Sequence, residues 1–157
     1  MAAPIQAVHH HLARMVGRDP HEEGRVATTL ELLYDLTLVV AFGVAGSEFA
    51  HSLAAGHIVE GSAAFFFVLF AVCWAWMSST WFDSAFDTDD WIVRVATMVQ
   101  MAGVLILTSG IPELFAGFDE GWQLRNQTIV LGYVVMRVPL VLLWWRASRD
   151  VASPALA

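Results

Sequence analysis

The chain has 157 residues, 57% hydrophobic and 15% charged, and its mean hydropathy is +0.60. Ordinary soluble domains carry about 25% charged residues, so this composition excludes a soluble globule and predicts an integral membrane protein. The formal net charge is -7, and the eight cationic side chains are all arginines without a basic cluster. The chain is therefore not expected to bind nucleic acid, and its predicted partner is the lipid bilayer.

The sequence divides into three parts. Residues 1–27 contain charged side chains and no long apolar run, which predicts a cytoplasmic N-terminal segment. Residues 28–147 form the predicted transmembrane domain, and residues 148–157 a short C-terminal tail. The single cysteine, Cys73, lies in an apolar run, so neither an intrachain disulfide nor a thiolate zinc site is expected. No cofactor is predicted.

Four apolar runs predict four transmembrane helices. They cover about residues 30–51, 62–81, 91–111 and 127–145. A helix rises about 1.5 Å per residue, so each run can cross a hydrocarbon core of roughly 30 Å. The expected fold is all-α, a polytopic membrane protein built as a bundle of four transmembrane helices.

Two carboxylates begin the first run. Thr28 followed by Glu31 matches the capping box, in which a Thr hydroxyl and a Glu carboxylate satisfy the first backbone donors of a helix. Glu31 therefore has a structural explanation. Asp35 lies one turn deeper, and an acid inside a membrane span faces a partner or a watery cavity. We therefore expect Asp35 to have a polar or charged partner elsewhere in the protein.

The link between the second and third runs is strongly acidic. It contains Asp83, Asp87, Asp89 and Asp90. Negative charge is favourable at a helix N-terminus, so capping and solvation is the simpler interpretation. The alternative is a divalent cation held by Asp87, Asp89 and Asp90, because hard cations prefer oxygen ligands. The spacing does not match the calcium loop of an EF-hand.

Two arginines lie in the membrane spans. Arg94 follows Asp90 by one helical turn, where a local ion pair forms easily. Arg137 lies near the middle of the fourth run, where an unpaired arginine costs at least about 2.5 kcal/mol. We therefore expect Arg137 to avoid lipid, and Arg94 and Arg137 are the best candidate partners of Asp35.

The arginines also predict the orientation. With the N-terminus in the cytoplasm, the arginines near both chain ends lie inside, and Arg125 lies in an outer loop. The positive-inside rule favours this arrangement, which makes the chain a multi-pass protein of the cell inner (plasma) membrane with both termini cytoplasmic.

In this orientation the charged residues of different spans meet at one depth. Asp35 and Arg94 lie within about 8 Å of the inner boundary, and the long side chain of Arg137 can reach the same level. The inner half of the bundle is therefore predicted to hold a polar cluster. Its members are Glu31, Asp35, Asp83, Asp87, Asp90, Arg94 and Arg137.

Several motifs occur together in this order: Arg25 before Glu31-Leu32-Leu33-Tyr34-Asp35-Leu36, then Trp81, Phe86-Asp87-Thr88-Asp89-Asp90 and Arg94, then Ile111-Pro112, then Tyr133 with Arg137. They resemble the bacterial low temperature requirement protein A (LtrA) family over roughly residues 25–150, with Leu33 in place of a usual aromatic residue. The resemblance implies an integral membrane protein and no particular reaction. Members of that family are usually longer, with further membrane helices.

Three functional classes fit these residues. The first is a transporter or channel-like protein whose polar pathway is lined by Asp35, Arg94 and Arg137. The second is a structural or assembly module in which buried ion pairs fix the helix register. The third, a metal-dependent membrane enzyme, is least favoured, because the sequence holds no nucleophile elbow, phosphate-binding glycine loop or histidine metal pair. Four short helices leave little room for a pathway within one chain, so a homo-oligomer is a candidate assembly.

Overall fold

The computed structural model describes residues 28–86 and 90–152, with side chains through Arg149. Five α-helices follow one another in this part of the chain: α1 (Thr29–Ala54), α2 (Ile58–Ala85), α3 (Trp91–Ser109), α4 (Ile111–Asp119) and α5 (Gln127–Ala152). By length and composition they provide four candidate membrane spans, with α3 and α4 counted as one. The predicted all-α bundle of four transmembrane helices is confirmed.

The helices are longer than the apolar runs. α1 begins at Thr29 because the Thr28 hydroxyl accepts a hydrogen bond from the amide of Glu31 at 3.2 Å, which is the expected cap. It ends before Gly56, whose φ of +87° lies in the left-handed region that favours glycine. α5 continues past the expected end at residue 145 to Ala152, so the first residues of the expected tail belong to this helix.

A short helix, α4, follows the third expected span, which ends at about residue 111. The helix α3 ends before Pro112, at Ser109. The chain then begins a new helix at Ile111, and Pro112 lies in its first turn. A proline is tolerated there because the first amides of a helix have no intrahelical acceptor. Pro112 therefore marks a helix start.

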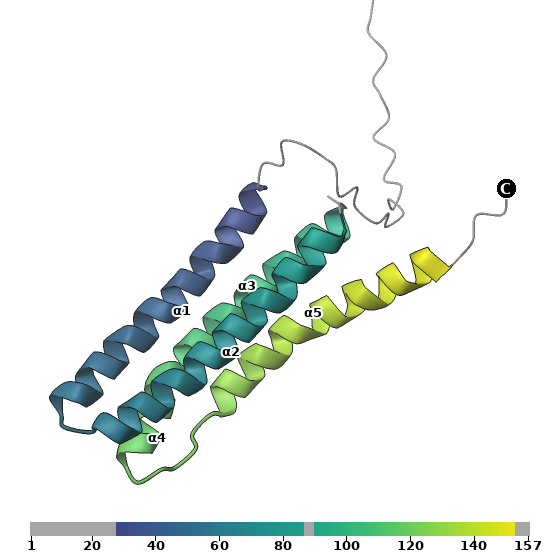
Figure 1. The fold of residues 1–157 in the computed structure, drawn as a ribbon. Coiled ribbons are helices and arrows are strands. Elements are labelled where there is room, and N and C mark those ends of the chain that lie inside the picture. The colour runs from purple at the N-terminus through teal and green to yellow at the C-terminus, as the bar shows by residue number, and fades with distance from the viewer. Residues whose placement is uncertain (1–27, 87–89, 153–157) are drawn as a thin grey trace, which may run out of the picture.

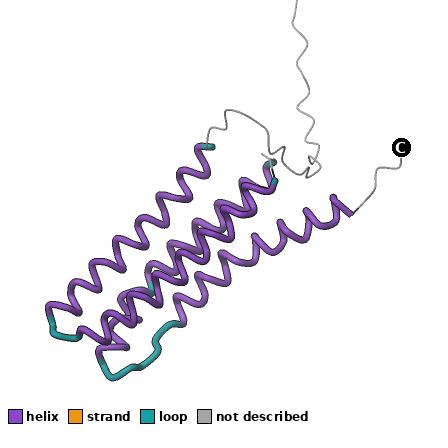
Figure 2. Tube along the Cα trace, viewed as in Figure 1, coloured by secondary structure: helices purple, strands orange, loops and turns teal. Residues whose placement is uncertain are grey.

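The four long helices run side by side as an antiparallel bundle, seen as a ribbon in Figure 1 and as a trace in Figure 2. α3 packs most extensively on α5, α1 lies against α2 and α3, and α2 lies against α5. The order around the bundle is therefore α1, α2, α5, α3. We call the end with the first residues of α1 and α3 the inner end, after the predicted orientation, and the end with α4 the outer end.

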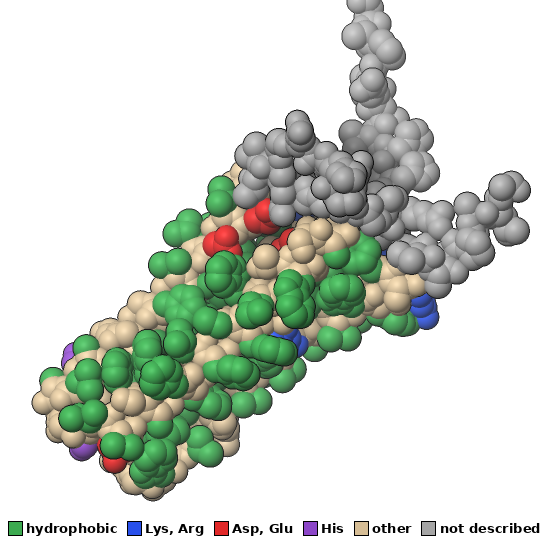
Figure 3. Space-filling view, viewed as in Figure 1, with side chains coloured by type: hydrophobic (Ala, Val, Ile, Leu, Met, Phe, Trp, Pro, Cys, Tyr) green, Lys and Arg blue, Asp and Glu red, His purple; other side chains and the backbone are tan. Residues whose placement is uncertain are grey.

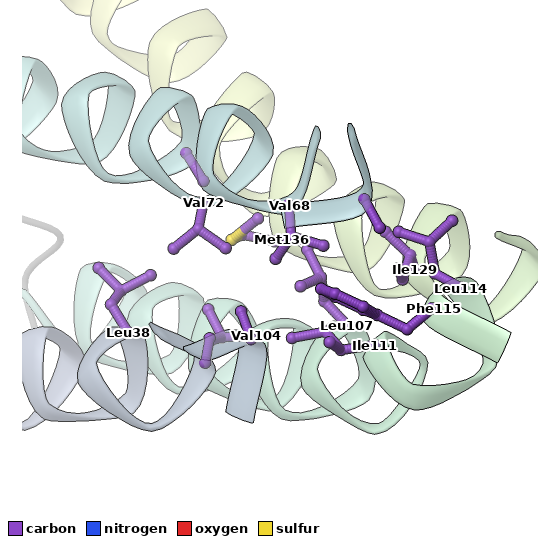
Figure 4. Close-up of a cluster of buried hydrophobic side chains, with 14 of the residues drawn as sticks. Leu38, Val68, Val72, Val104, Leu107, Ile111, Leu114, Phe115, Ile129 and Met136 are labelled. Carbon is purple, nitrogen blue, oxygen red and sulfur yellow. The ribbon is translucent and has the colours of Figure 1, made fainter. Parts of the chain in front are cut away.

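The middle of the bundle is filled by apolar side chains. Figure 4 shows them pointing toward one another from different helices, among them Leu38, Val68, Val72 and Val104. Each of these four is at most 4% exposed. The same core continues toward α4 through Leu107, Ile111 and Leu114.

Two glycines let α3 and α5 approach closely. A Cβ at Gly103 would lie 2.7 Å from the amide nitrogen of Met136, and a Cβ at Gly132 would overlap the backbone of Leu107. These neighbours are backbone atoms that cannot rotate away. Small residues at helix contacts are the usual way in which membrane helices pack, and this pair explains why α3 and α5 form the most extensive contact.

The outside of the bundle is apolar. Large hydrophobic side chains are exposed on every long helix, and Figure 3 shows them covering most of the visible face, with acidic side chains gathered toward one end. An exposed surface of this kind is what lipid requires. The tertiary structure therefore agrees with the membrane class that the composition predicts.

We expect Gly132→Ala to lower the free energy of unfolding by about 1–3 kcal/mol, because overpacking at a backbone contact forces the helices apart. Gly46→Ala is the matched control, since a Cβ there would meet nothing within 4 Å. That control should be neutral or stabilising because alanine favours helices. Denaturant titration in detergent micelles measures both. Equal effects of the two substitutions would contradict the close α3–α5 packing.

Candidate functional site

Tyr34 joins three helices in the inner half of the bundle. Its side chain is 5% exposed, and its hydroxyl lies 2.9 Å from Oγ of Ser79 in α2 and 3.8 Å from Sδ of Met136 in α5. The Ser79 hydroxyl donates its proton to the carbonyl of Ala75 at 2.8 Å. Because a serine has one proton to donate, Tyr34 donates to Ser79, and this leaves the Tyr34 hydroxyl no second proton for Sδ of Met136, which it contacts at 3.8 Å.

Gln100 is a second buried polar residue of the inner half. It is 4% exposed, and its Oε1 accepts no hydrogen bond from the residues that the structure describes. Gln100 lies one helical turn before Gly103, and Gly103 packs closely against Met136. Met136 also contacts the hydroxyl of Tyr34. A buried carbonyl without a donor costs about 1–3 kcal/mol. We therefore expect Oε1 of Gln100 to accept a hydrogen bond from a donor outside the described residues.

Asp35 lies on the surface of the bundle. Its Oδ1 accepts a hydrogen bond from Nε1 of Trp76 in α2 at 3.0 Å. The expected ion pair with Arg94 or Arg137 is not found within residues 28–86 and 90–152, and the indole takes its place. For Arg137 the helix order is the reason, because α1 packs beside α2 and lies diagonally across from α5.

Arg137 is half-buried beside α2. One of its terminal nitrogens, Nη2, donates to the hydroxyl of Tyr133 at 2.7 Å and to the carbonyl of Trp74 at 3.2 Å. The guanidinium also lies 4.8 Å from the centre of the Tyr133 ring, a cation–π distance. Arg137 thus avoids full exposure to lipid through a polar contact with α2 and an aromatic contact within α5.

The most buried ion pair of the described residues joins the inner ends of α3 and α5. Asp90 Oδ2 lies 2.8 Å from Nη2 of Arg146, and the two side chains are 5% and 18% exposed. Asp90 does occupy the N-cap position of α3, but its side chain makes no capping hydrogen bond. The carboxylate binds Arg146, and the Asp90 carbonyl accepts a hydrogen bond from the backbone amide of Arg94 at 3.0 Å. Within the described residues, the ion pair of Asp90 is therefore an interhelical one.

The other predicted members of the cluster are placed as follows. Glu31 and Asp83 are half-buried near the inner end, and Arg94 is exposed on α3. Arg137, Asp83 and Asp35 all lie near Tyr34. Asp87 and Asp89 lie outside the described residues. The structure therefore brings part of the predicted cluster to one level, around a tyrosine to which the sequence motifs assigned no role.

The predicted divalent cation site stays a prediction. Among the residues that the structure describes, no group of three or more His, Cys, Asp or Glu side chains could hold a metal ion. Two of the three candidate ligands, Asp87 and Asp89, are outside that part of the chain. The third, Asp90, is engaged by Arg146.

A second polar cluster lies at the outer end. Asp119 at the end of α4 lies 3.2 Å from Nδ1 of His57, and the hydroxyl of Ser52 donates to its other oxygen at 3.4 Å. Ser52 is buried and packs against Gly61. This cluster was not predicted from the sequence. Nothing in the sequence near these residues indicates that α4 folds back onto the connection between α1 and α2.

The apolar core separates the two polar clusters. Tyr34 and Ser52 lie at opposite ends of the buried stripe of α1, and the stripe between them is formed by Leu38, Ala41 and Ala45. These three are at most 4% exposed. The described bundle therefore holds polar groups at its inner and outer ends and a dry layer in between, an arrangement that can bind at either end and is closed in the middle.

The Asp90–Arg146 pair can be tested by substitution. We expect Asp90→Asn to lower the free energy of unfolding by about 2–3 kcal/mol, because it removes the negative charge from a contact with Arg146 in which the Asp90 side chain is only 5% exposed. The control is the exposed pair of Glu120 and Arg125. Their Oε2 and Nη2 atoms lie 2.6 Å apart, and both side chains are about half exposed. Glu120→Gln should cost at most about 1 kcal/mol. Equal losses in micelle unfolding would show that Asp90 is not held in a buried pair.

Comparison with known proteins agrees with the motifs and the fold. The family described as Bacterial low temperature requirement A protein (LtrA) matches residues 26–156. No curated protein and no solved structure matches the chain. The family match covers most of the sequence, including the motifs around Tyr34, Asp90 and Arg137, and it confirms the resemblance. This multi-pass membrane protein therefore belongs to the LtrA family.

Proposed function

We propose that this chain is a transporter of the carrier type, which binds a small polar or charged solute in the inner half of its bundle. The binding groups are the Tyr34 hydroxyl and the Gln100 amide, both on buried side chains. Asp83, which is half-buried, contributes negative charge near the inner end. Polar and ionisable residues inside a membrane are costly and commonly mark solute or ion pathways.

The observation that carries the proposal is the buried oxygen of Gln100. Its neighbours on the buried face of α3 are Ala96 and Gly103, which offer no side-chain donor. Thr108, the other buried polar residue of α3, is satisfied by the carbonyl of Val104 at 2.8 Å. A polar group that is buried and unsatisfied calls for a functional explanation, and a bound solute or water that donates to Oε1 provides one.

The dry layer supports a carrier over an open channel. Leu38, Val68 and Val104 close the middle of the bundle, so a solute bound near Tyr34 has access from one side only. A carrier needs such a closed gate in each of its states. A permanently open channel through one chain does not fit this core.

A second candidate function is a structural or assembly module. The Asp90–Arg146 pair favours it, because this contact joins the inner ends of two helices. Buried polar contacts can fix the register of helices. Under this alternative, Tyr34 and Ser79 are also register contacts, and Gln100 is a tolerated defect.

The proposed orientation has support from the arrangement of the described arginines. Arg94, Arg146 and Arg149 lie at the inner end, and Arg125 lies in the connection at the outer end. In a Cys73→Ala background, Trp122→Cys should react with a membrane-impermeant maleimide on intact cells. Ser148→Cys should react only after permeabilisation. The reverse pattern would place the polar cluster at the opposite membrane face.

Gln100→Leu separates the two candidate functions. In a carrier it should reduce transport about tenfold, the equivalent of one lost hydrogen bond to a charged group. In a structural module it should leave the free energy of unfolding unchanged or raise it, because it removes an unsatisfied buried carbonyl. Currents on a solid-supported membrane, driven in turn by gradients of protons, sodium, potassium, chloride and phosphate, measure the transport.

Tyr34→Phe should reduce the same current. Thr108→Val is the matched control, since its hydroxyl bonds only the carbonyl of Val104 in its own helix. The carrier proposal fails if no gradient drives a protein-dependent current, or if the control reduces the current as much as Gln100→Leu. Folded yield after size-exclusion chromatography is compared for every variant.

A further inference from the structure

Asp35 and Arg137 lie on the two flanks of α2. Asp35 reaches α2 from α1 through the indole of Trp76, and Arg137 reaches it from α5 through the carbonyl of Trp74. In the view of Figure 1, α2 lies in front of α3 with α1 on one side and α5 on the other. The outward face of α2 is therefore bordered by an acid on one side and by a base on the other.

The two charges lie at the same depth. Both are located against α2, at Trp76 and Trp74, and these positions are two residues apart. At about 1.5 Å per residue, their contact points differ by about 3 Å along the helix axis. The acid and the base are thus level with each other across α2, although they belong to helices that do not pack together.

Neither charge is neutralised within the described residues. Oδ1 of Asp35 accepts from Trp76, and its other oxygen takes no hydrogen bond from residues 28–86 or 90–152. Arg137 uses one terminal nitrogen, Nη2, for both of its contacts, and a guanidinium has five N–H donors. The short side chain of Asp35 cannot extend to the membrane boundary as a long arginine can, so a carboxylate exposed at this depth calls for a cation.

The face between the two charges is apolar. Phe66, Phe70, Met77 and Trp81 are 65%, 67%, 45% and 61% exposed, and their spacing places them on one side of α2. The buried residues Val68, Val72 and Ser79 lie on the opposite side. In Figure 3 hydrophobic side chains cover this face of the bundle.

We propose that this face is the interface with a second copy of the chain, and that Asp35 of each copy pairs with Arg137 of the other. A twofold axis along the membrane normal brings two α2 helices together and places α1 of one copy opposite α5 of the other. Because the acid and the base are level, the same rotation forms both ion pairs at once. Such self-complementarity is the mark of a twofold interface.

The second copy is the occupant that the charges favour. A lipid headgroup could neutralise one sign of charge, but it would not place an acid and a base at equal depth on opposite flanks. The interface is independent of transport, since a structural module would use it equally.

Cysteine cross-linking in native membranes tests the interface. In a Cys73→Ala background, Met77→Cys should form a covalent dimer of twice 17.3 kDa under oxidation. Met98→Cys on α3 is the matched control. Met98 is 56% exposed, as against 45% for Met77, and the two methionines lie at similar distances from the inner ends of their helices. Met98→Cys should give little dimer.

Charge reversal tests the ion pairs. Asp35→Arg places two cations opposite each other at both contacts, and Arg137→Asp places two anions there, so each alone should lower the Met77→Cys dimer about tenfold or more. Co-expressed with different tags, the two variants should recover a mixed dimer, because each cation then meets an anion. Trp76→Phe should leave cross-linking unchanged, since it removes the indole donor and keeps the charge.

Three results would overturn the proposal. The first is equal cross-linking at positions 77 and 98. The second is a dimer that persists in both charge-reversed variants, and the third is a co-expressed pair that gives no mixed dimer. If a reversed variant has low folded yield, Asp35→Asn and Arg137→Gln replace it, and a dimer fraction that is unchanged in both neutral variants also overturns the proposal.

Discussion

Hydrocarbon offers no hydrogen bonds, so each polar group inside the membrane must find its partner within protein. Most hydroxyls of this chain meet the constraint locally: Ser62, Ser78, Thr80, Thr97 and Thr108 donate to carbonyls of their own helices. The few that bond across helices are therefore informative. They join α1 and α2 at Tyr34 and Ser79, α1 and α4 at Ser52, and α4 and α5 at Glu113 and Thr128. The first contact lies toward the inner end of the bundle and the other two lie at the outer end.

Close packing of α3 and α5 supports the inner polar cluster. Gly103 and Gly132 bring the two backbones together, and Met136 is held at the contact where it also meets the Tyr34 hydroxyl. Asp90 and Arg146 join the same two helices at the inner end. The α3–α5 pair thus acts as a rigid unit against which α1 and α2 place Tyr34 and Ser79.

The charges of the predicted cluster fall into different roles once the helix order is known. Asp90 is satisfied by Arg146 and fixes two helices. Asp35 and Arg137 face outward on the flanks of α2, where a second copy can satisfy them. Tyr34 and Gln100, which carry no charge, are the groups that turn inward beside the core. The interior of the inner half is therefore polar without being charged. This arrangement fits a binding site for a small solute better than it fits a network of buried ion pairs.

Hydropathy and residue spacing by themselves determined the membrane class, the four spans, the helix start at Thr28 and the family, because these depend on local composition and on motifs within single helices. Residue spacing also placed Asp35, Arg94 and Arg137 near one depth in the membrane. It could not assign their partners, since depth along an axis does not say which helices are neighbours. Only the tertiary structure decided that α1 lies diagonally across from α5, which separates Asp35 from Arg137, and that Gly103 and Gly132 bring α3 onto α5. The reason is physical: the period of a helix shows which side chains share a face, whereas the helix that covers this face depends on how all four pack around a common core.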